Sequence, residues 1–441
     1  MPPIVRGVKL WFIFILLLAG GAATELRAQT NWLTLAEARR QALERNWDFL
    51  AARSGVDAAT AAALMAREFP NPNLSASTAK IGNRENATPA GNGIWARSYD
   101  TIFAVNQLLE IGGKRRDRQR AAQAGVMGAK ARLADARRLL EQGVTRAYIA
   151  AALAGTNAGI LRESAAYLQH EAQLAEFRWH AGDLARADYQ PMAVAAGQYE
   201  LQAAAAETAA RQARIAVEIL LGVRQPEGNW LPAETLDQLR QMLAAPAPVR
   251  ASTTISNQRP DVRAAEADLQ SAEASLQLQR ALRIPDPTVA VQFEHNPPGG
   301  GPPTDTIGLG VSFPLPLWNL NQGAIAQARA AREQSRLALE KARAQAVGDL
   351  ANARAESAEA TARWQRYHDQ IGPQSAAARD AIGFKYEKGG AALVDLLEAE
   401  RTDNDVRIAT AQALADTLTA AADLVASQTV LTEADLPWNH E

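Results

Sequence analysis

The chain has 441 residues, of which 46 are Lys or Arg and 48 are Asp or Glu, so its formal net charge is -2. This balance lacks the basic excess typical of a nucleic-acid-binding protein, and we expect no nucleic-acid partner. There is no cysteine, which excludes disulfides, thiol nucleophiles and lipid attachment through an N-terminal cysteine. The length suffices for two or three ordinary domains or for one elongated domain.

The first 28 residues have the pattern of a cleaved secretory signal. Arg6 and Lys9 precede the apolar run LWFIFILLLAG, and small residues follow it. The run is too short to span a bilayer, although an uncleaved N-terminal anchor is the alternative. Cleavage after Ala23 or Ala28 fits the small residues. No later run reaches 18 apolar residues, so the mature chain is either soluble and exported or crosses a membrane as strands.

Residues 31–222 form the first of two predicted structural units. A helical pattern from Thr34 ends at the prolines of FPNPN, because proline cannot continue a helix. Period-two alternation then predicts strands at about 72–82 and 98–109. A proline-free stretch at about 114–180 predicts a helix on the order of 100 Å long. The segment HAGDLARADY interrupts this helix, and another helix follows.

Residues 257–428 form the second predicted unit, after a segment at 223–256 that contains proline and glycine and that we expect to lie at the middle of the molecule. Its elements follow the order of the first unit: a helix ended by IPDP, strands at about 287–296 and 305–316, and a long helix at about 322–386. Gly372-Pro373 predicts a kink in this long helix. Residues 429–441 are interpreted as a C-terminal tail.

The two units can be aligned with each other at their turns. The stretch FKYEKGGAALVD aligns with FRWHAGDLARAD, so that Gly389 corresponds to Gly182 and Asp395 corresponds to Asp188. Self-similarity over such a length indicates a duplicated unit of helix, hairpin, long helix, turn and helix.

The predicted strands have one apolar and one polar face. In DTIGLGVSFPLPL, large apolar residues alternate with Thr, Gly, Ser and Pro, and the polar sides of the strands carry Asp100, Asn106, Gln292, Glu294, Thr306 and Ser312. Strands of about ten residues with this alternation are typical of membrane β-barrels. Small soluble sheets packed on the helices are the alternative.

Four strands cannot cross a membrane by themselves, because an open sheet would leave edge N–H and C=O groups unpaired in lipid. Several chains must then share one barrel, and a trimer contributing twelve strands is the smallest arrangement expected to hold an aqueous lumen. The alanine-rich helices would continue this tube into the periplasm. A solid exported coiled coil would have a similar composition.

Several motifs resemble those of the TolC-type outer-membrane efflux proteins. They are RPDVRAAEADLQSAEA, LLEIGGKR, FPLPLWNLNQG and YEKGGAALVDLLEAER. GGKR and NQG are similar to the branch that contains the outer-membrane subunit of cobalt-zinc-cadmium resistance pumps. The resemblance covers nearly all of the mature chain. It implies a mainly α fold with a small membrane β part: a duplicated helix–hairpin–helix unit that forms a trimeric twelve-stranded β-barrel, continued by a long periplasmic α-helical barrel.

The resemblance also implies a function. The chain would be a passive, gated exit duct of a tripartite efflux pump in the Gram-negative outer membrane. It would form a homotrimer in contact with outer-membrane lipid and dock through a periplasmic adaptor on an inner-membrane pump of the resistance-nodulation-division type. Divalent heavy-metal cations are the candidate substrates. A duct for protein or polysaccharide secretion and a wholly soluble periplasmic coiled-coil adaptor are the alternatives.

The resemblance places a gate at the periplasmic tip. The turns there contain Gly182 and Gly389, and the acidic constriction of the family matches Asp395 and Glu398, with Asp188 as the counterpart of Asp395 in the first unit. Carboxylates at a narrowing concentrate cations. Acids in the first turn of a helix are also favoured by the helix dipole, whatever their function. An arginine that helps to lock the closed tip in some relatives is replaced here by Ala391.

Two stretches are assigned to the junctions between strands and long helices. They comprise Gly112, Gly113, Lys114 and Arg115 in the first unit and Asn321, Gln322 and Gly323 in the second. We expect the glycines to permit a tight turn and both basic residues to face solvent or lipid headgroups, or the whole stretch to be a plain solvated turn.

The sequence predicts neither enzymatic chemistry nor a cofactor. The five histidines are scattered without metal-ligand spacing, and no nucleophile, base and orienting group occur together.

Overall fold

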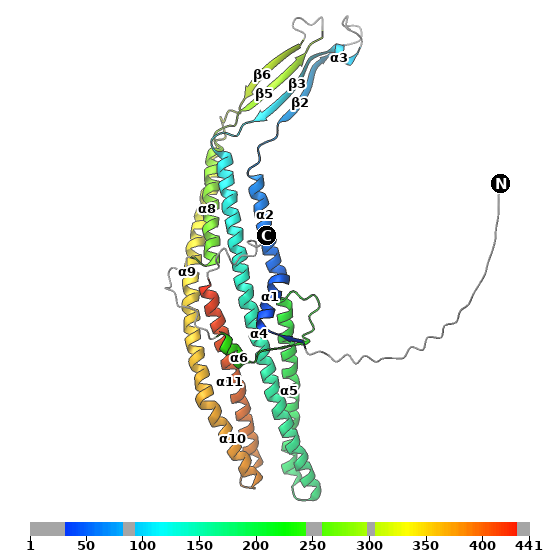
Figure 1. The fold of residues 1–441 in the computed structure, drawn as a ribbon, viewed down its shortest axis with the longest axis vertical. Coiled ribbons are helices and arrows are strands. Elements are labelled where there is room, and N and C mark those ends of the chain that lie inside the picture. Colours follow the sequence, from blue (N-terminus) through cyan, green and yellow to red (C-terminus); the bar gives the residue numbers. More distant parts are fainter. Residues whose placement is uncertain (1–30, 83–92, 244–257, 298–304, 430–441) are drawn as a thin grey trace, which may run out of the picture.

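The computed structural model describes residues 31–82, 93–243, 258–297 and 305–429. The predicted signal at 1–28, the tail beyond Thr429 and part of the segment between the two units lie outside these residues. Helices dominate the described chain, and they extend the molecule along one axis (Figure 1). They are α1 (Leu35–Arg45), α2 (Trp47–Met65), α3 (Ile94–Arg97), α4 (Lys114–Ala181), α5 (Arg186–Leu220), α6 (Leu236–Leu243), α8 (Pro260–Ala281), α9 (Gln322–Arg366), α10 (Gly372–Glu387) and α11 (Leu393–Gln428).

Helix α4 is the central helix of the layer, with 68 residues and no proline. In the half near the sheet it packs between α2 and α8, and α9 packs on the far side of α8. In the other half α4 packs between α5 and α11, and α10 packs on α11. Each half is therefore a single layer of helices, and alanine or glycine at the contacts allows close approach of the helix axes.

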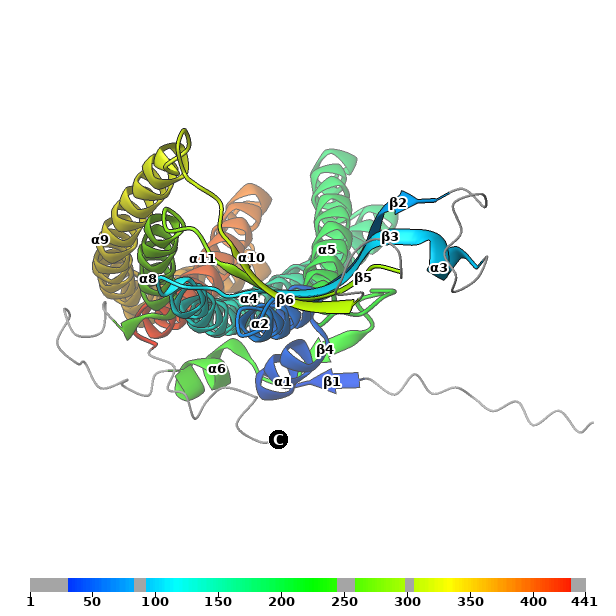
Figure 2. The same cartoon turned by 90° about the horizontal axis from the view of Figure 1, so that it is seen from above.

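The helical layer is curved. Seen from above, α9, α10 and α5 bend toward one side, while α1, α6 and two short strands lie on the other (Figure 2). The layer is thus concave on the face away from α1 and α6. The two short strands are β1 (Asn31–Leu33) and β4 (Trp230–Pro232), which pair in parallel.

The second long helix is interrupted near Gly372-Pro373, where the sequence predicted a kink. Helix α9 ends at Arg366, a π-helical turn covers Tyr367–Ile371, and α10 begins at Gly372. Proline has no N–H and its ring clashes with the preceding turn, so the backbone changes its hydrogen-bond register there.

The long strands form one antiparallel sheet in the described chain, in the order β2–β3–β5–β6. They are β2 (Asn73–Ile81), β3 (Ser98–Leu108), β5 (Thr288–His295) and β6 (Asp305–Ser312). The sequence predicted two hairpins, and the structure adds the pairing of β3 with β5, which joins the two units. Strands β2 and β6 are left as the edges.

The register of the sheet gathers the apolar side chains into rows. Phe103 lies opposite Phe293, which lies opposite Ile307, and the next row contains Val105, Val291 and Leu309. These side chains are exposed in the single chain, to 83% for Leu309. The row between them contains Ala104, Gln292 and Gly308. The polar residues Glu294, Thr306 and Asn106 lie in the rows on either side, so the opposite face is mixed polar and small. One face of the sheet is therefore an apolar surface that nothing in the described chain covers.

The short strands are held to α4 by Tyr148, a fully buried residue. Its hydroxyl lies 2.6 Å from the carbonyl oxygen of Leu33, contacts the carboxylate of Glu234 and accepts a hydrogen bond from the N–H of Ala233 at 3.1 Å. Burial, followed by the hydrogen bond to Glu234, raises the pKa of the Tyr148 phenol. The neutral phenol thus links β1, β4 and α4.

Replacing Tyr148 by Phe is expected to cost about 2 kcal/mol of stability, because the carbonyl of Leu33 and the half-buried carboxylate of Glu234 both lose the hydroxyl that contacts them. The melting temperature, followed by circular dichroism at the helix band, would fall. Tyr189→Phe is the matched control, since the Tyr189 hydroxyl makes no hydrogen bond within the described residues and its ring stacks on Trp179. Equal losses in both variants would contradict the prediction.

Candidate functional site

Two similar turns form the end of the molecule opposite the sheet, one joining α4 to α5 and one joining α10 to α11 (Figure 1). Gly182 and Gly389 adopt left-handed backbone angles, with φ of 84° and 72°. The N–H of Asp183 donates to the carbonyl of Arg178 at 2.8 Å, and Gly390 donates to Lys385 at 2.7 Å. Both helices therefore end in the same capping motif. A Cβ would have open space at both glycines, so the left-handed φ is the reason for glycine there.

The predicted gate residues lie directly after these turns. Asp188 and Asp395 occupy the same position in the first turns of α5 and α11, and both are exposed. The Asp395 carboxylate accepts a hydrogen bond from the N–H of Ala392 at 3.1 Å, so it caps α11. Glu398 lies one turn further along and makes no such contact within the described residues. Helix capping thus explains why an acid occupies position 395, whereas no local contact explains the acid at position 398.

Acidic side chains lie near the buried tyrosines of the helices behind the tip. Burial, followed by the charges of Glu171 and Glu400, raises the pKa of Tyr167 to about 12. Burial, followed by Glu171, also raises the pKa of Tyr386. The pKa of the Glu400 carboxyl is itself raised, chiefly by burial, with Asp403 contributing. Burial is the largest cause of all three shifts, and neighbouring carboxylates add to it.

Polar contacts link α11 to α10 and to α4 in this half, although sequence reasoning did not single them out. The guanidinium of Arg379 on α10 donates to the buried carboxylate of Asp403 on α11 at 2.7 Å. The buried Ser164 hydroxyl on α4 donates to the Asn404 side chain at 2.5 Å. Asp403 and Asn404 lie in the polar run ERTDND, so no local sequence signal indicates that these two side chains are buried. The tip hairpins are therefore linked through α11.

The structure corrects the expectation for Lys114, which does not face solvent or headgroups. Lys114 is 3% exposed. Its ammonium lies 2.7 Å from a carboxylate oxygen of Asp286 and 2.5 Å from the carbonyl oxygen of Ile284. Asp286 also accepts a hydrogen bond from the N–H of Ile111 at 2.9 Å. Lys114 thus joins the two units where α8 ends. Its partner Asp286 is the acid of the IPDP motif, which could have suggested a Lys114–Asp286 ion pair.

Arg115 likewise is half-buried and packs within the chain. Its guanidinium donates to the carbonyl of Arg67 at 2.6 Å and lies 4.0 Å above the ring of Phe69. Arg115 therefore remains partly exposed while it contacts the segment after α2, which returns to the sheet alongside the start of α4. The junction is a packed joint and not a plain solvated turn.

Both strand–helix junctions contain a residue with a left-handed backbone conformation. Gly112 and Gly113 have φ of 73° and 80° before α4, and Asn321 has φ of 59° before α9. Asn321 also donates through its side chain to the carbonyl of Gln279 at 2.8 Å. Gln322 and Gly323 are the first residues of α9. A left-handed residue therefore redirects the chain from strand to helix in both units, with glycine in one and asparagine in the other.

Neither a transmembrane helix nor a metal cluster is found in the part of the chain that the structure describes. No helix there combines the length and the apolar character needed to cross a bilayer. Within the same residues, no three His, Cys, Asp or Glu side chains come together to hold a metal ion.

Comparison with known proteins agrees with this architecture. The chain matches the family described as outer membrane efflux protein over residues 38–223 and 252–428. It is 27% identical over 383 residues to the cobalt-zinc-cadmium resistance protein CzcC of Cupriavidus metallidurans, covering 85% of each chain.

Solved structures show the same fold. A crystal structure of CusC has a TM-score of 0.74 at 19% identity, with 89% of this chain and 91% of that chain covered. A membrane protein from Pseudomonas aeruginosa has a TM-score of 0.73 at 20% identity, with 90% and 93% covered. The chain therefore belongs to the outer membrane efflux protein family, and it is a transport channel of the Gram-negative outer membrane that extends into the periplasm, not an enzyme.

Proposed function

We propose that three copies of this chain close into one tube, with a twelve-stranded barrel in the outer membrane and a helical barrel in the periplasm. The free edges of β2 and β6 support this arrangement, because a sheet in lipid must pair every edge. The exposed apolar rows of the sheet supply the lipid-facing surface. The concave face of the helical layer (Figure 2) would then line the lumen.

The tube would act as the passive exit duct of a tripartite pump, docking through a periplasmic adaptor on an inner-membrane pump of the resistance-nodulation-division type. Divalent heavy-metal cations are the proposed substrates. The observation that carries this choice is the 27% identity to a protein named for cobalt, zinc and cadmium resistance. The acidic residues Glu171, Glu400 and Asp403 behind the tip agree with cation passage. The family match favours this channel over the soluble periplasmic adaptor.

The test is deletion of the gene in its host with the neighbouring pump genes intact. We expect a several-fold fall in tolerance to cobalt, zinc or cadmium, restored by a copy of the gene in trans, with unchanged tolerance to hydrophobic drugs as the specificity control. Unchanged tolerance to all metals, combined with loss of a secreted protein or polysaccharide, would contradict metal efflux and support the secretion alternative.

A further inference from the structure

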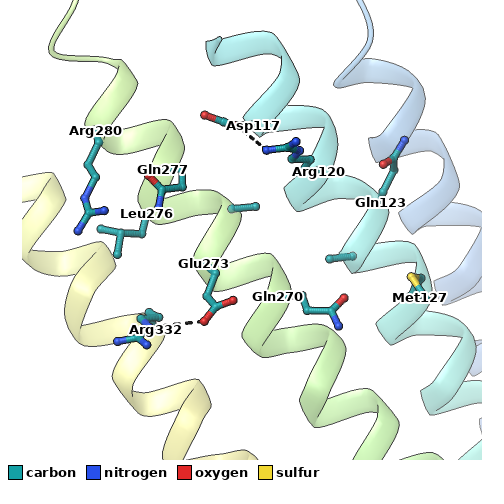
Figure 3. A pocket seen from close by; sticks show the side chains of 12 residues that line it. Asp117, Arg120, Gln123, Met127, Gln270, Glu273, Leu276, Gln277, Arg280 and Arg332 are labelled. Carbon is teal, nitrogen blue, oxygen red and sulfur yellow. Dashed lines mark ion pairs between the residues drawn. The ribbon is translucent and has the colours of Figure 1, made fainter. Parts of the chain in front are cut away.

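A cleft of about 660 Å³ lies between α4, α8 and α9, near the helix ends that lead to the sheet (Figure 3). Three guanidiniums line it, one from each helix: Arg120, Arg280 and Arg332. Ala124 and Leu276 contribute apolar surface between them. The cleft therefore offers several cationic donors around a partly apolar wall.

These guanidiniums are weakly engaged within the chain. Arg120 lies 3.7 Å from Asp117, and Arg332 lies 3.7 Å from Glu273 (Figure 3). Charge-assisted hydrogen bonds are usually about 2.7–2.9 Å long. Arg280 has no carboxylate partner among the described residues. Arg280 of α8 and Arg332 of α9 lie on the same side of α8 (Figure 3). Because arginine presents several donors in a fork that fits phosphate, these two guanidiniums are the candidate phosphate ligands.

The cleft opens on the convex face of the layer. Helix α4 keeps a seven-residue burial repeat in this stretch, with Asp117, Ala124, Arg138, Thr145 and Ala152 buried. Arg120 and Tyr148 are four repeats of seven residues apart, so they occupy the same position in this burial repeat. Tyr148 contacts β1, which lies on the convex side with α1 and α6 (Figure 2). The cleft thus faces outward from the proposed tube and not into its lumen.

An exposed apolar segment lies directly beside the cleft. The side chain of Asn321 donates to the carbonyl of Gln279, in the last turn of α8, and so holds the segment before α9 against that turn. In this segment Leu317 is exposed and Trp318 is 93% exposed, and Ile284 just after α8 is exposed as well. Tryptophan is enriched at membrane interfaces. The apolar surface of the sheet therefore continues to the edge of the cleft.

We propose that the cleft binds the phosphate of an anionic glycerophospholipid from the periplasmic leaflet, whose acyl chains lie against Leu317 and Trp318. The inference rests on the membrane placement of the sheet in the proposed function. The three arginines outnumber the two acids, Asp117 and Glu273, so a headgroup with net negative charge is favoured over a zwitterionic one. Such a lipid would neutralise the cleft and hold α8 and α9 at the membrane surface.

Native mass spectrometry of the full-length protein in detergent tests this proposal. The protein is titrated with phosphatidylglycerol, phosphatidylethanolamine or inorganic phosphate. We expect preferential retention of phosphatidylglycerol, and a loss of affinity on the order of twentyfold in the double variant Arg280→Gln/Arg332→Gln, since each basic residue at a membrane surface contributes about fivefold. Arg336→Gln is the matched control, because Arg336 lies one turn further along α9 and is paired with Glu333 at 2.7 Å.

Three outcomes would overturn the proposal. Equal retention of phosphatidylglycerol by the double variant and by the wild type would show that Arg280 and Arg332 do not bind the lipid. Full competition by inorganic phosphate would make the cleft a free-anion site. Retention of neither lipid would remove the lipid site. Metal tolerance does not enter this readout, so a failed efflux test and a failed lipid test can be told apart.

Discussion

Replacing Asp395 and Glu398 by their amides is expected to weaken the cation preference of the channel in a planar bilayer by about fivefold to tenfold. A unit charge at about 4 Å contributes on the order of 1 kcal/mol in water, and a difference of about 1.4 kcal/mol is a factor of ten. The amides remove charge without removing the cap, because the asparagine side chain introduced by Asp395→Asn keeps an oxygen for the N–H of Ala392. The measurement is the reversal potential under a salt gradient, at low ionic strength where screening is weak.

Two control variants separate gating from capping. Asp395→Ala removes both the charge and the hydrogen bond to Ala392, and its stability should fall by about 1 kcal/mol. Asp188→Asn neutralises the counterpart in α5 without touching this cap. If the amide variants keep the selectivity of the wild type and only Asp395→Ala changes stability or conductance, the two acids stabilise the helix and do not select ions.

Replacing Lys114 by Met is expected to destabilise the protein by about 3 kcal/mol, because the Asp286 carboxylate is left without its cation in a largely buried joint. The change also removes the donor to the carbonyl of Ile284. The melting temperature in detergent should fall, and the loss should exceed that of any exposed arginine nearby.

The double variant Lys114→Met/Asp286→Leu tests the cause of this loss. Replacing both charges by apolar groups should recover much of the stability, since a buried pair contributes little net energy while an unpaired buried charge is costly. Arg116→Met is the matched control, because the Arg116 side chain is 67% exposed and 3.5 Å from Asp117. A double variant as unstable as Lys114→Met would indicate that packing, and not the unpaired carboxylate, explains the effect.

Local sequence patterns predicted much of the fold. Alternation along β6 placed Ile307, Leu309 and Val311 on one face, and they lie on one exposed face in the structure. The absence of proline between residues 114 and 180 indicated one long helix, and α4 runs from Lys114 to Ala181. The alignment of Gly182 with Gly389 matches their common left-handed angles and capping bonds. Such features depend on residues close together in the chain, so a single sequence reveals them.

The sequence by itself determined the duplicated order of elements, the strand alternation and the turn residues, because periodicity and backbone preference act over a few residues. Only the tertiary structure decided that Lys114 is buried against Asp286, that β3 pairs with β5, and that three arginines from α4, α8 and α9 line one cleft. Each of these features joins segments that are far apart in the chain or lie on separate helices. Burial and ion pairing depend on such long-range packing, which is set by how the helical layer curves and not by any local pattern.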